Sequence, residues 1–140
     1  MNLNAAIKLT PLRRITTAGG DVLHALKSTD NEFSGFGEAY FSTVDIGSIK
    51  GWKKHKRMTM NLIVPVGEVE FVFYFDKTNE FLSFIVGANR YARITVLPGV
   101  WFAFKGMSEP YSLVLNISDI PHDPDEVERC SLSDIDFSWK

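Results

Sequence analysis

The sequence has little cysteine and little histidine, and this scarcity removes several kinds of site. Cys130 is the only cysteine in 140 residues, so an intrachain disulfide and a cysteine-based zinc centre are both excluded. The three histidines lie far apart and form no His-x-His pair. A metal-binding β-barrel typically supplies two or three histidines and a carboxylate from neighbouring strands. The sequence therefore predicts no bound metal and no cofactor.

Long apolar runs and a strong net charge are also missing. No segment approaches the roughly 20 apolar residues of a membrane span, and the start, MNLNAAIKLTPLRR, lacks the apolar core of a signal peptide. The net charge of −2 and the isoelectric point near 5.9 argue against a general nucleic-acid binder. With a single thiol, which fits a reducing compartment, the sequence indicates a cytoplasmic protein with neither a membrane nor a nucleic-acid partner.

Common catalytic motifs are lacking as well. There is no G-x-S-x-G elbow, and Cys130 lies in the polar stretch EVERCSLSD with no histidine close in sequence. Neither VGEV nor GVWFAFKG has the spacing of a phosphate loop or a dinucleotide-binding turn. These absences argue against a serine or cysteine hydrolase, a nucleotide triphosphatase and a nicotinamide enzyme.

What the sequence does contain is a series of short aromatic and β-branched runs, separated by turn residues such as Gly67-Glu68 and Pro98-Gly99. Many short strands at this spacing predict an all-β sandwich or barrel. Strands are expected at 36–44, 59–66, 69–75, 81–86, 92–97, 100–104 and 111–117, with a last short one at 135–139. We expect residues 1–140 to form one domain, with an N-terminal arm (1–18) and a C-terminal tail (119–140). In the tail, we expect a capped turn around His122, with Asp123 or Asp125 starting a short helix.

The stretch KGWKKHKRM holds five of the fifteen cations within nine residues. If residues 51–61 form one extended strand, side chains alternate between two faces. One face then carries Lys53, His55, Arg57, Thr59 and Asn61, while the other becomes apolar after Lys56. A polar row that runs into a barrel is costly unless it lines a wet cavity or a ligand site. The alternative is that this face meets solvent, as one side of an antiparallel sheet often does.

Several segments, in order, resemble the sugar-nucleotide cupins. They are GGDVLHAL, FGEAYFSTVDIGSIKGWKKH, GEV, PGVWFAF and DIDFSW. The layout is similar to the dTDP-4-dehydrorhamnose 3,5-epimerase family, whose F-x-Q-x-N-x-S and L-R-G-L-H motifs match Phe36, Ser42, Ile49 and Gly51 in spacing. The stretch KGWKKHK also resembles the R-G-x-H-A-H-K motif of the dTDP-4-keto-6-deoxyhexose 3,4-ketoisomerases.

This resemblance, which spans residues 19–139, implies a single-domain, cupin-type jelly roll (double-stranded β-helix) that is commonly a homodimer. It implies a nucleotide-sugar ligand and a metal-independent epimerase or isomerase of a 4-keto-6-deoxyhexose, used to make surface polysaccharides. The chain departs from the epimerase pattern, since Lys53 stands at the base histidine, Lys50 at an arginine and Phe102 at a second histidine. A non-catalytic cupin that binds a sugar or sugar nucleotide, or that partners a biosynthetic enzyme, therefore stays open.

The resemblance also assigns site residues. His55 is the first candidate base, since histidine as a residue type titrates in the range that proton abstraction needs. Lys53 is either a second candidate base or a cation that stabilises the enolate. The expected substrate contacts are Lys50, Lys56 and Arg57 for the diphosphate, and Glu38, Tyr40, Asn61, Tyr91 and Asn116 elsewhere on the ligand. His24 is expected to carry no chemistry.

Overall fold

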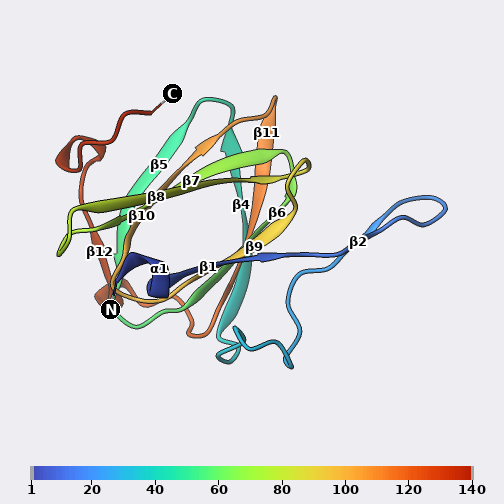
Figure 1. Ribbon diagram of the computed structural model, residues 1–140, viewed down its shortest axis with the longest axis horizontal. Helices are drawn as coiled ribbons and strands as arrows, with labels where there is room; N and C mark the ends of the chain where they lie inside the picture. Colours follow the sequence, from blue (N-terminus) through green and yellow to red (C-terminus); the bar gives the residue numbers. More distant parts are fainter. Residues whose placement is uncertain (1, 140) are drawn as a thin grey trace.

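The computed structural model describes residues 2–139 and consists of two five-stranded antiparallel sheets that face each other (Figure 1). Sheet I has the strand order β1-β9-β6-β11-β4, and sheet II has the order β12-β5-β10-β7-β8. The elements are α1 (Leu3–Ala6), β1 (Ile7–Pro11), β2 (Arg14–Ile15), β3 (Val22–Leu23), β4 (Glu38–Asp45), β5 (Ile49–His55), β6 (Met60–Val66), β7 (Glu68–Phe75), β8 (Glu80–Gly87), β9 (Ala92–Val96), β10 (Trp101–Gly106), β11 (Tyr111–Ser118), η1 (Pro124–Glu126), β12 (Val127–Arg129) and η2 (Leu132–Asp134).

The core lies between the two sheets, and its residues come from the inward faces of both. In sheet II, Phe71 and Phe73 of β7 are completely buried, with ring centroids 6.5 Å apart. In sheet I, Leu62 and Ile94 of the paired strands β6 and β9 are buried in the same cluster. Alternate residues of a strand point to one face, so these runs pack the two sheets together and form a sandwich. This is the jelly roll that the sequence predicts, and the all-β, cupin-type fold class is confirmed.

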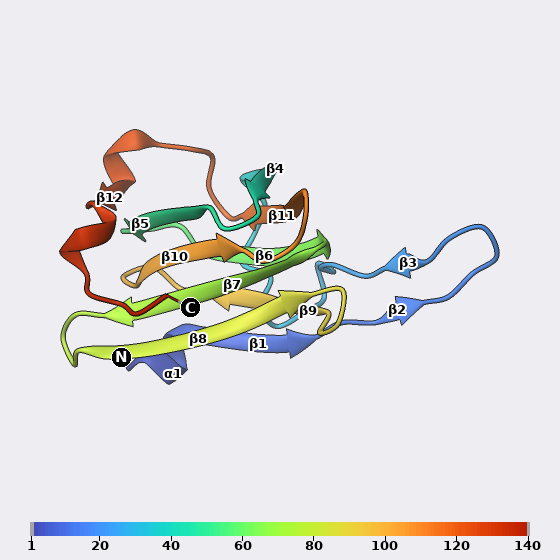
Figure 2. The same cartoon turned by 90° about the horizontal axis from the view of Figure 1, so that it is seen from above.

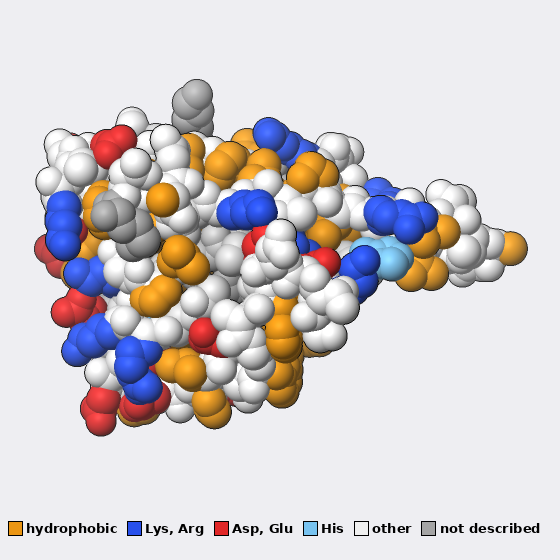
Figure 3. Space-filling view, turned by 60° about the horizontal axis from the view of Figure 1, so that its bottom comes forward, with side chains coloured by type: hydrophobic (Ala, Val, Ile, Leu, Met, Phe, Trp, Pro, Cys, Tyr) orange, Lys and Arg blue, Asp and Glu red, His pale blue; other side chains and the backbone are white. Residues whose placement is uncertain are grey.

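A two-stranded hairpin, β2–β3, stands out from the body of the molecule (Figures 1 and 2). Its base is tied to the body through Arg14, whose Nη1 donates to the Ala88 carbonyl oxygen at 3.2 Å and whose guanidinium carbon lies 5.5 Å from the Tyr91 ring centroid. Basic side chains gather where the hairpin leaves the body (Figure 3). The sequence of residues 21–27, DVLHALK, is compatible with either a short helix or an edge strand, and within it Val22–Leu23 form the second strand of this hairpin.

The buried side chain of Arg93 holds the chain after the hairpin against the outer face of sheet I. Its Nη1 donates to the Ala25 carbonyl oxygen at 2.7 Å, and its Nη2 donates to Glu32 at 2.8 Å. Lys8 of β1 pairs with the same Glu32 carboxylate at 2.6 Å. This network of charged groups lies on the outer face of sheet I, over β1 and β9.

The seven strands predicted between residues 36 and 117 correspond to β4 and to β6 through β11. Two sequence interpretations were wrong. Residues 51–61 are not one strand, because β5 ends at His55 in sheet II and β6 begins at Met60 in sheet I. Residues 135–139 are not a strand, since their aromatic side chains pack on the outer face of sheet II, where the ring centroids of Trp139 and Trp52 are 6.3 Å apart.

The two ends of the chain contribute strands to the sheets. The arm contains β1, which pairs with β9 along five residues, and the tail contains β12, which pairs with β5. The short helix expected in the tail is confirmed as η1, and its N-cap is Asp123, whose side chain accepts from the Asp125 amide. In residues 2–139, the only α-helix, α1, has four residues, so no described helix has the length and apolar character to cross a membrane.

Candidate active site

A pocket of about 190 Å³ opens between the two sheets, at the end of the sandwich where β4, β5 and β12 meet. Its inner part is apolar and is formed by Met58, Met60, Leu62, Phe102 and Phe104. The polar side chains that line it are Tyr40, Ser42, Lys50, Lys53, His55, Asn116, His122 and Arg129. An apolar cavity with a few convergent polar groups is the usual form of a small-molecule site.

A β-bulge in β5 determines which basic side chains face this pocket. In the ladder with β10, Phe102 pairs with Lys53 and Ala103 pairs with Gly51, so Trp52 is an extra residue. A bulge of this kind shifts the alternation of the strand by one position. Lys50 and Lys53 therefore line the same pocket, although strict alternation would place residues three apart on opposite faces.

The bulge depends on the glycine at position 51. Gly51 has φ of +152°, and a Cβ there would lie 2.4 Å from the Cβ of Ala103. Only glycine adopts this backbone conformation readily and allows β10 to approach so closely.

His55, at the end of β5, forms a buried pair with Glu126 from η1. Oε1 of Glu126 bonds Nδ1 of His55, and Oε2 accepts from the amides of Arg57 and Met58, both at 3.2 Å. The Glu126 side chain is only 2% exposed. Burial acts to raise the pKa of Glu126, but the hydrogen bonds from His55 and the two amides outweigh it and lower the pKa below its usual 4.5. The carboxylate is therefore ionised near neutral pH.

An ionised carboxylate at Nδ1 fixes the proton of the neutral imidazole on that nitrogen. Nε2 is then the ring nitrogen with a free lone pair, which is the form that accepts a proton. The ring of Phe102 stacks beside the imidazole, with centroids 5.8 Å apart and an interplanar angle of 18°. The arrangement is that of an oriented general base at the wall of a pocket.

The opposite wall of the pocket belongs to sheet I and carries a hydrogen-bonded Tyr40–Asn116 pair. Nδ2 of Asn116 donates to the Tyr40 hydroxyl oxygen at 3.0 Å. Because that oxygen accepts from Asn116, the hydroxyl proton of Tyr40 is free to be donated to another group. Oδ1 of Asn116 is buried and has no hydrogen-bond partner among the described residues. This wall offers a donor and an acceptor across the pocket from His55.

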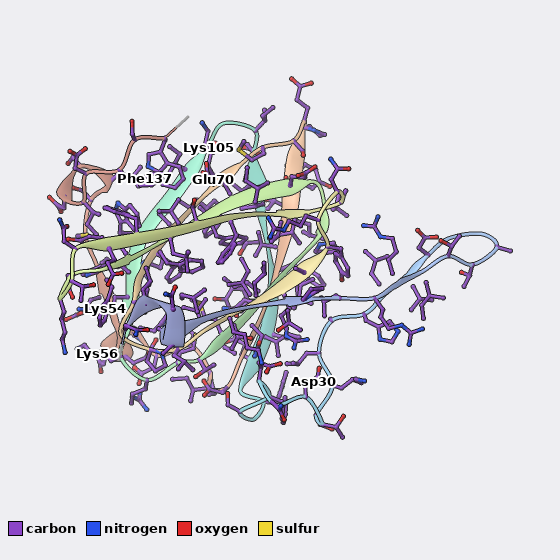
Figure 4. The ribbon with its side chains drawn as sticks, in the orientation of Figure 1. Asp30, Lys54, Lys56, Glu70, Lys105 and Phe137 are labelled. Carbon is purple, nitrogen blue, oxygen red and sulfur yellow. The ribbon has the colours of Figure 1, made fainter. Side chains whose placement is uncertain are left out.

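The five cations of the basic cluster divide into two groups. Lys54 pairs with Glu128 at 3.0 Å, Arg57 pairs with Asp123 at 2.8 Å, and Lys56 donates to a backbone carbonyl in the tail at 3.4 Å. Lys54 and Lys56 lie at the outer margin of the molecule (Figure 4). Lys50 and Lys53 face the pocket, where the Lys50 ammonium donates to the Thr43 carbonyl oxygen at 2.6 Å.

No protein-family model matches the chain, and no curated protein does. Among solved structures, a dTDP sugar isomerase from Desulfovibrio desulfuricans G20 is 36% identical, with a TM-score of 0.90 over 95% of this chain and 90% of that one. The chain belongs to the dTDP-sugar isomerase family. The resemblance to sugar-nucleotide cupins is thereby confirmed.

More distant structures share the fold of this dTDP-sugar isomerase family member. The 3,4-ketoisomerase QdtA from Thermoanaerobacterium thermosaccharolyticum, in complex with TDP, is 19% identical, with a TM-score of 0.77 over 89% of this chain and 88% of that one. A dTDP-4-dehydrorhamnose 3,5-epimerase from Bacillus anthracis str. Ames, with TDP and PPi bound, is 16% identical, with a TM-score of 0.84 over 99% of this chain and 87% of that one.

The structure brings together five of the site residues predicted for this family member, namely Lys50, Lys53, His55, Tyr40 and Asn116. The other five, Lys56 among them, lie outside the pocket. Arg57 pairs with the tail, and Glu38 accepts from the His122 amide at 2.9 Å. Asn61 points to the outer face of sheet I, where it accepts from Thr95 at 2.6 Å, and Tyr91 donates to the His24 carbonyl oxygen at 2.7 Å.

Sequence reasoning did not identify Glu126 or Arg129 as site residues, and it expected His122 only in a capped turn. All three come from the segment 119–129, which crosses the pocket entrance before β12 pairs with β5. The one signal in the sequence was the set of carboxylates in PHDPDEVER, and nothing there distinguishes the buried Glu126 from its exposed neighbours. In residues 2–139, no group of three or more His, Cys, Asp or Glu side chains is arranged to hold a metal ion.

Proposed function

We propose that this protein is an isomerase or epimerase of a dTDP-linked 4-keto-6-deoxyhexose, with His55 as the general base. The observation that carries the proposal is the buried His55–Glu126 pair at the wall of a pocket lined by cations. The 36% identity with a dTDP sugar isomerase supports the substrate class. Such an activity belongs to the synthesis of deoxysugar precursors for surface polysaccharides, which we place in the cytoplasm.

The proposed reaction begins when Nε2 of His55 removes a proton from the carbon next to the C4 ketone. Glu126 stabilises the imidazolium that forms, because its carboxylate is ionised and lies at Nδ1. The ketone oxygen gains negative charge in this step and needs a hydrogen-bond donor or a cation nearby. The Tyr40 hydroxyl on the opposite wall is free to donate.

The fate of the proton determines the product. If the proton removed from C3 is delivered to C4 while the C3 hydroxyl proton passes to the C4 oxygen, the enediol intermediate becomes a C3 ketone with a C4 hydroxyl, and the substrate is isomerised. If the proton returns to the original carbon from the other side of the ring, that carbon is epimerised. Both reactions share the first step, so one assay of proton exchange tests both.

The test is to incubate the protein with dTDP-4-keto-6-deoxyglucose in deuterated buffer and to follow C3, C4 and C5 by NMR. We expect deuterium uptake by the native protein and a loss of about a hundredfold or more in His55→Gln, as for removal of a general base. His24→Gln is the matched control, because His24 lies outside this pocket, and it should exchange at the native rate. If several nucleotide sugars bind but take up no deuterium above background, the enzymatic proposal is wrong.

One observation favours a second function, the non-catalytic cupin. Lys53 and Phe102 both face the pocket at positions where the related families carry histidine. Of the three family histidine positions at 53, 55 and 102, only His55 still holds a histidine. Nucleotide-sugar binding without exchange would support this second function.

We also propose that the protein is a homodimer. Among residues 2–139, the edge strand β4 pairs only with β11 and exposes Phe41 at 62%, and Phe36, two residues before this strand, is 67% exposed. A free edge that carries exposed aromatic side chains is a usual place for association. Light scattering after size exclusion should give twice the chain mass of 15.8 kDa, and Phe41→Glu should shift the protein toward the monomer.

A further inference from the structure

We propose that Lys53 and Arg129 together hold the diphosphate of the nucleotide sugar, so that β12 supplies one side of the substrate site. This inference rests on the proposed function, because it assigns a ligand group to the same pocket. It replaces the diphosphate contact predicted for Arg57 and gives Lys53 a binding role.

Lys53 and Arg129 are directly opposite each other in the antiparallel ladder between β5 and β12. Opposed residues in such a ladder have Cβ atoms about 5 Å apart, and like charges in this position repel each other. Neither side chain forms an ion pair with a carboxylate in residues 2–139, whereas the adjacent Lys54 pairs with both Asp76 and Glu128. The chain therefore neutralises Lys54 and leaves the two cations that line the pocket, half-buried Lys53 and exposed Arg129, without a carboxylate partner among these residues.

The charge of the side chains that line the pocket also favours an anionic ligand. Among residues 2–139, no Asp or Glu side chain lines it, while Lys50, Lys53 and Arg129 all do. Lys53 is half-buried; burial, followed by the charges of Arg129 and Lys50, lowers its pKa. A ligand with two or three negative charges would remove this repulsion. A diphosphate suits the pair, since a guanidinium binds phosphate oxygens in a bidentate manner and an ammonium adds a compact charge.

The position along β5 also fits a nucleotide sugar. Lys53 and His55 point into the pocket from the same strand, two residues and therefore about 7 Å apart. This spacing is comparable to a sugar ring with its glycosidic oxygen. A sugar whose reacting carbon lies at His55 thus brings its diphosphate to Lys53 and to Arg129, while the apolar inner wall lies beside the ring.

The experiment is calorimetric titration of the native protein and of Lys53→Met and Arg129→Met with dTDP, dTMP and inorganic pyrophosphate. We expect each variant to lose about tenfold or more in dTDP affinity, as for a lost hydrogen bond to a charged group. The preference of the native protein for dTDP over dTMP should shrink in both variants. Lys54→Met and Arg57→Met are the matched controls, since both side chains pair outside the pocket, and they should bind dTDP as the native protein does.

A second measurement, made on the native protein, tests whether the diphosphate contacts Lys53 directly. Because the pKa of Lys53 is lowered, a bound diphosphate should raise it again and cause proton uptake. The charged and titratable groups that face Lys53 are Arg129 on β12, Lys50 and His55 on β5, and His122 at the entrance. The uptake is measured at about pH 9, well above the reference pKa of histidine, in two buffers of different ionisation enthalpy. It should be present in the native protein and absent in a Lys53→Met variant that keeps the native unfolding midpoint.

The inference is wrong if dTDP binds both variants within about twofold of the native affinity, where the change in binding free energy is below 0.5 kcal/mol, or if dTDP does not bind the native protein. It is also wrong if Arg57→Met loses affinity and Arg129→Met does not. The proposed activity fails separately: diphosphate binding through Lys53 and Arg129 without deuterium exchange would leave this inference standing and remove the isomerase.

Discussion

Replacing Glu126 by glutamine should inactivate the protein, because the proton of the His55 imidazole would move from Nδ1 to Nε2. A glutamine side chain has nearly the same size, and its carbonyl oxygen still accepts from the amides of Arg57 and Met58, which now donate to Oε2 at 3.2 Å. Its NH₂ group then lies at Nδ1 of His55 and needs an acceptor there. The imidazole proton moves to Nε2, so the nitrogen that faces the substrate loses its lone pair.

The expected loss of rate follows from that change. A positioned general base contributes about 10²–10⁴-fold to the rate, so we expect Glu126→Gln to slow deuterium exchange by at least a hundredfold. Binding of dTDP should stay close to native, because Glu126 does not line the pocket. Glu128→Gln is the matched control, since Glu128 is two residues away and pairs with Lys54 on the outer side, and it should leave the rate unchanged.

The same substitution has a measurable cost in stability with a defined pH dependence. Hydrogen bonds to a charged group contribute about 1.5–3 kcal/mol, and Glu126→Gln should lower the free energy of unfolding by an amount in this range. The pKa of Glu126 is lower in the folded protein than its usual 4.5, so its stabilising effect is complete above that pH. The effect is lost as the pH falls through the folded pKa, and the native and variant curves should converge in acid.

Three measurements test the role of the Glu126 carboxylate. Urea unfolding between neutral and acidic pH gives the difference in stability, exchange by NMR gives the rate, and nitrogen-15 shifts of His55 report which ring nitrogen carries the proton. A Glu126→Gln variant that exchanges at the native rate, or that keeps its proton on Nδ1, would refute the role assigned to this carboxylate.

Three further substitutions test the fold around the site. Gly51→Ala should destabilise the protein by about 2 kcal/mol, since the new Cβ would lie 2.4 Å from that of Ala103; urea unfolding measures it, and an unchanged midpoint would contradict the bulge geometry. Arg93→Met leaves the half-buried carboxylate of Glu32, now 2.8 Å away, with Lys8 as its remaining ion-pair partner; we expect a loss of about 1.5–3 kcal/mol, as for lost hydrogen bonds to a charged group, and faster proteolysis of the loop that Arg93 anchors. Phe137→Ala (Figure 4) should cost about 1–2 kcal/mol, because its ring contacts two aromatic rings at 5.0 and 5.3 Å; thermal unfolding tests this, and no change would mean that the tail adds no stability.

The strands were predictable because their signals are local. β7 and β9 are runs of apolar and β-branched residues bounded by turn residues, and their positions follow from the sequence to within one residue. The turn signal at Gly67 is equally local, since this glycine, with φ of +80°, is the single residue between β6 and β7. Such features depend on neighbouring residues alone, so composition and spacing are sufficient to find them.

The faces of the basic strand were harder to predict because two irregularities interrupt the alternation. The bulge at Trp52 brings Lys50 and Lys53 to the same side, and the bend after His55 moves the chain from sheet II to sheet I. After the bend, Met60 and Leu62 face the pocket, and Asn61 faces away from it. The predicted polar row therefore ends at His55, and Thr59 and Asn61 do not continue it.

The partners of His55 and Lys53 could not be predicted at all. Glu126 and Arg129 are more than seventy positions later in the chain, and they reach the pocket only because β12 pairs with β5. A three-residue strand gives almost no signal of its own. A buried glutamate also has no sequence signature, since it is the geometry of the fold that provides the amides and the imidazole around it.

The same pairing sets the order in which the site can be assembled during synthesis. The strands that enclose the core end at Ser118, so both sheets can form around His55 before residues 126–129 leave the ribosome. Until then the imidazole has no carboxylate beside it, and Lys53 has no arginine opposite. A nascent chain can thus be folded and still incompetent, and the last strand to be made is the one that completes the proposed base and the diphosphate contact.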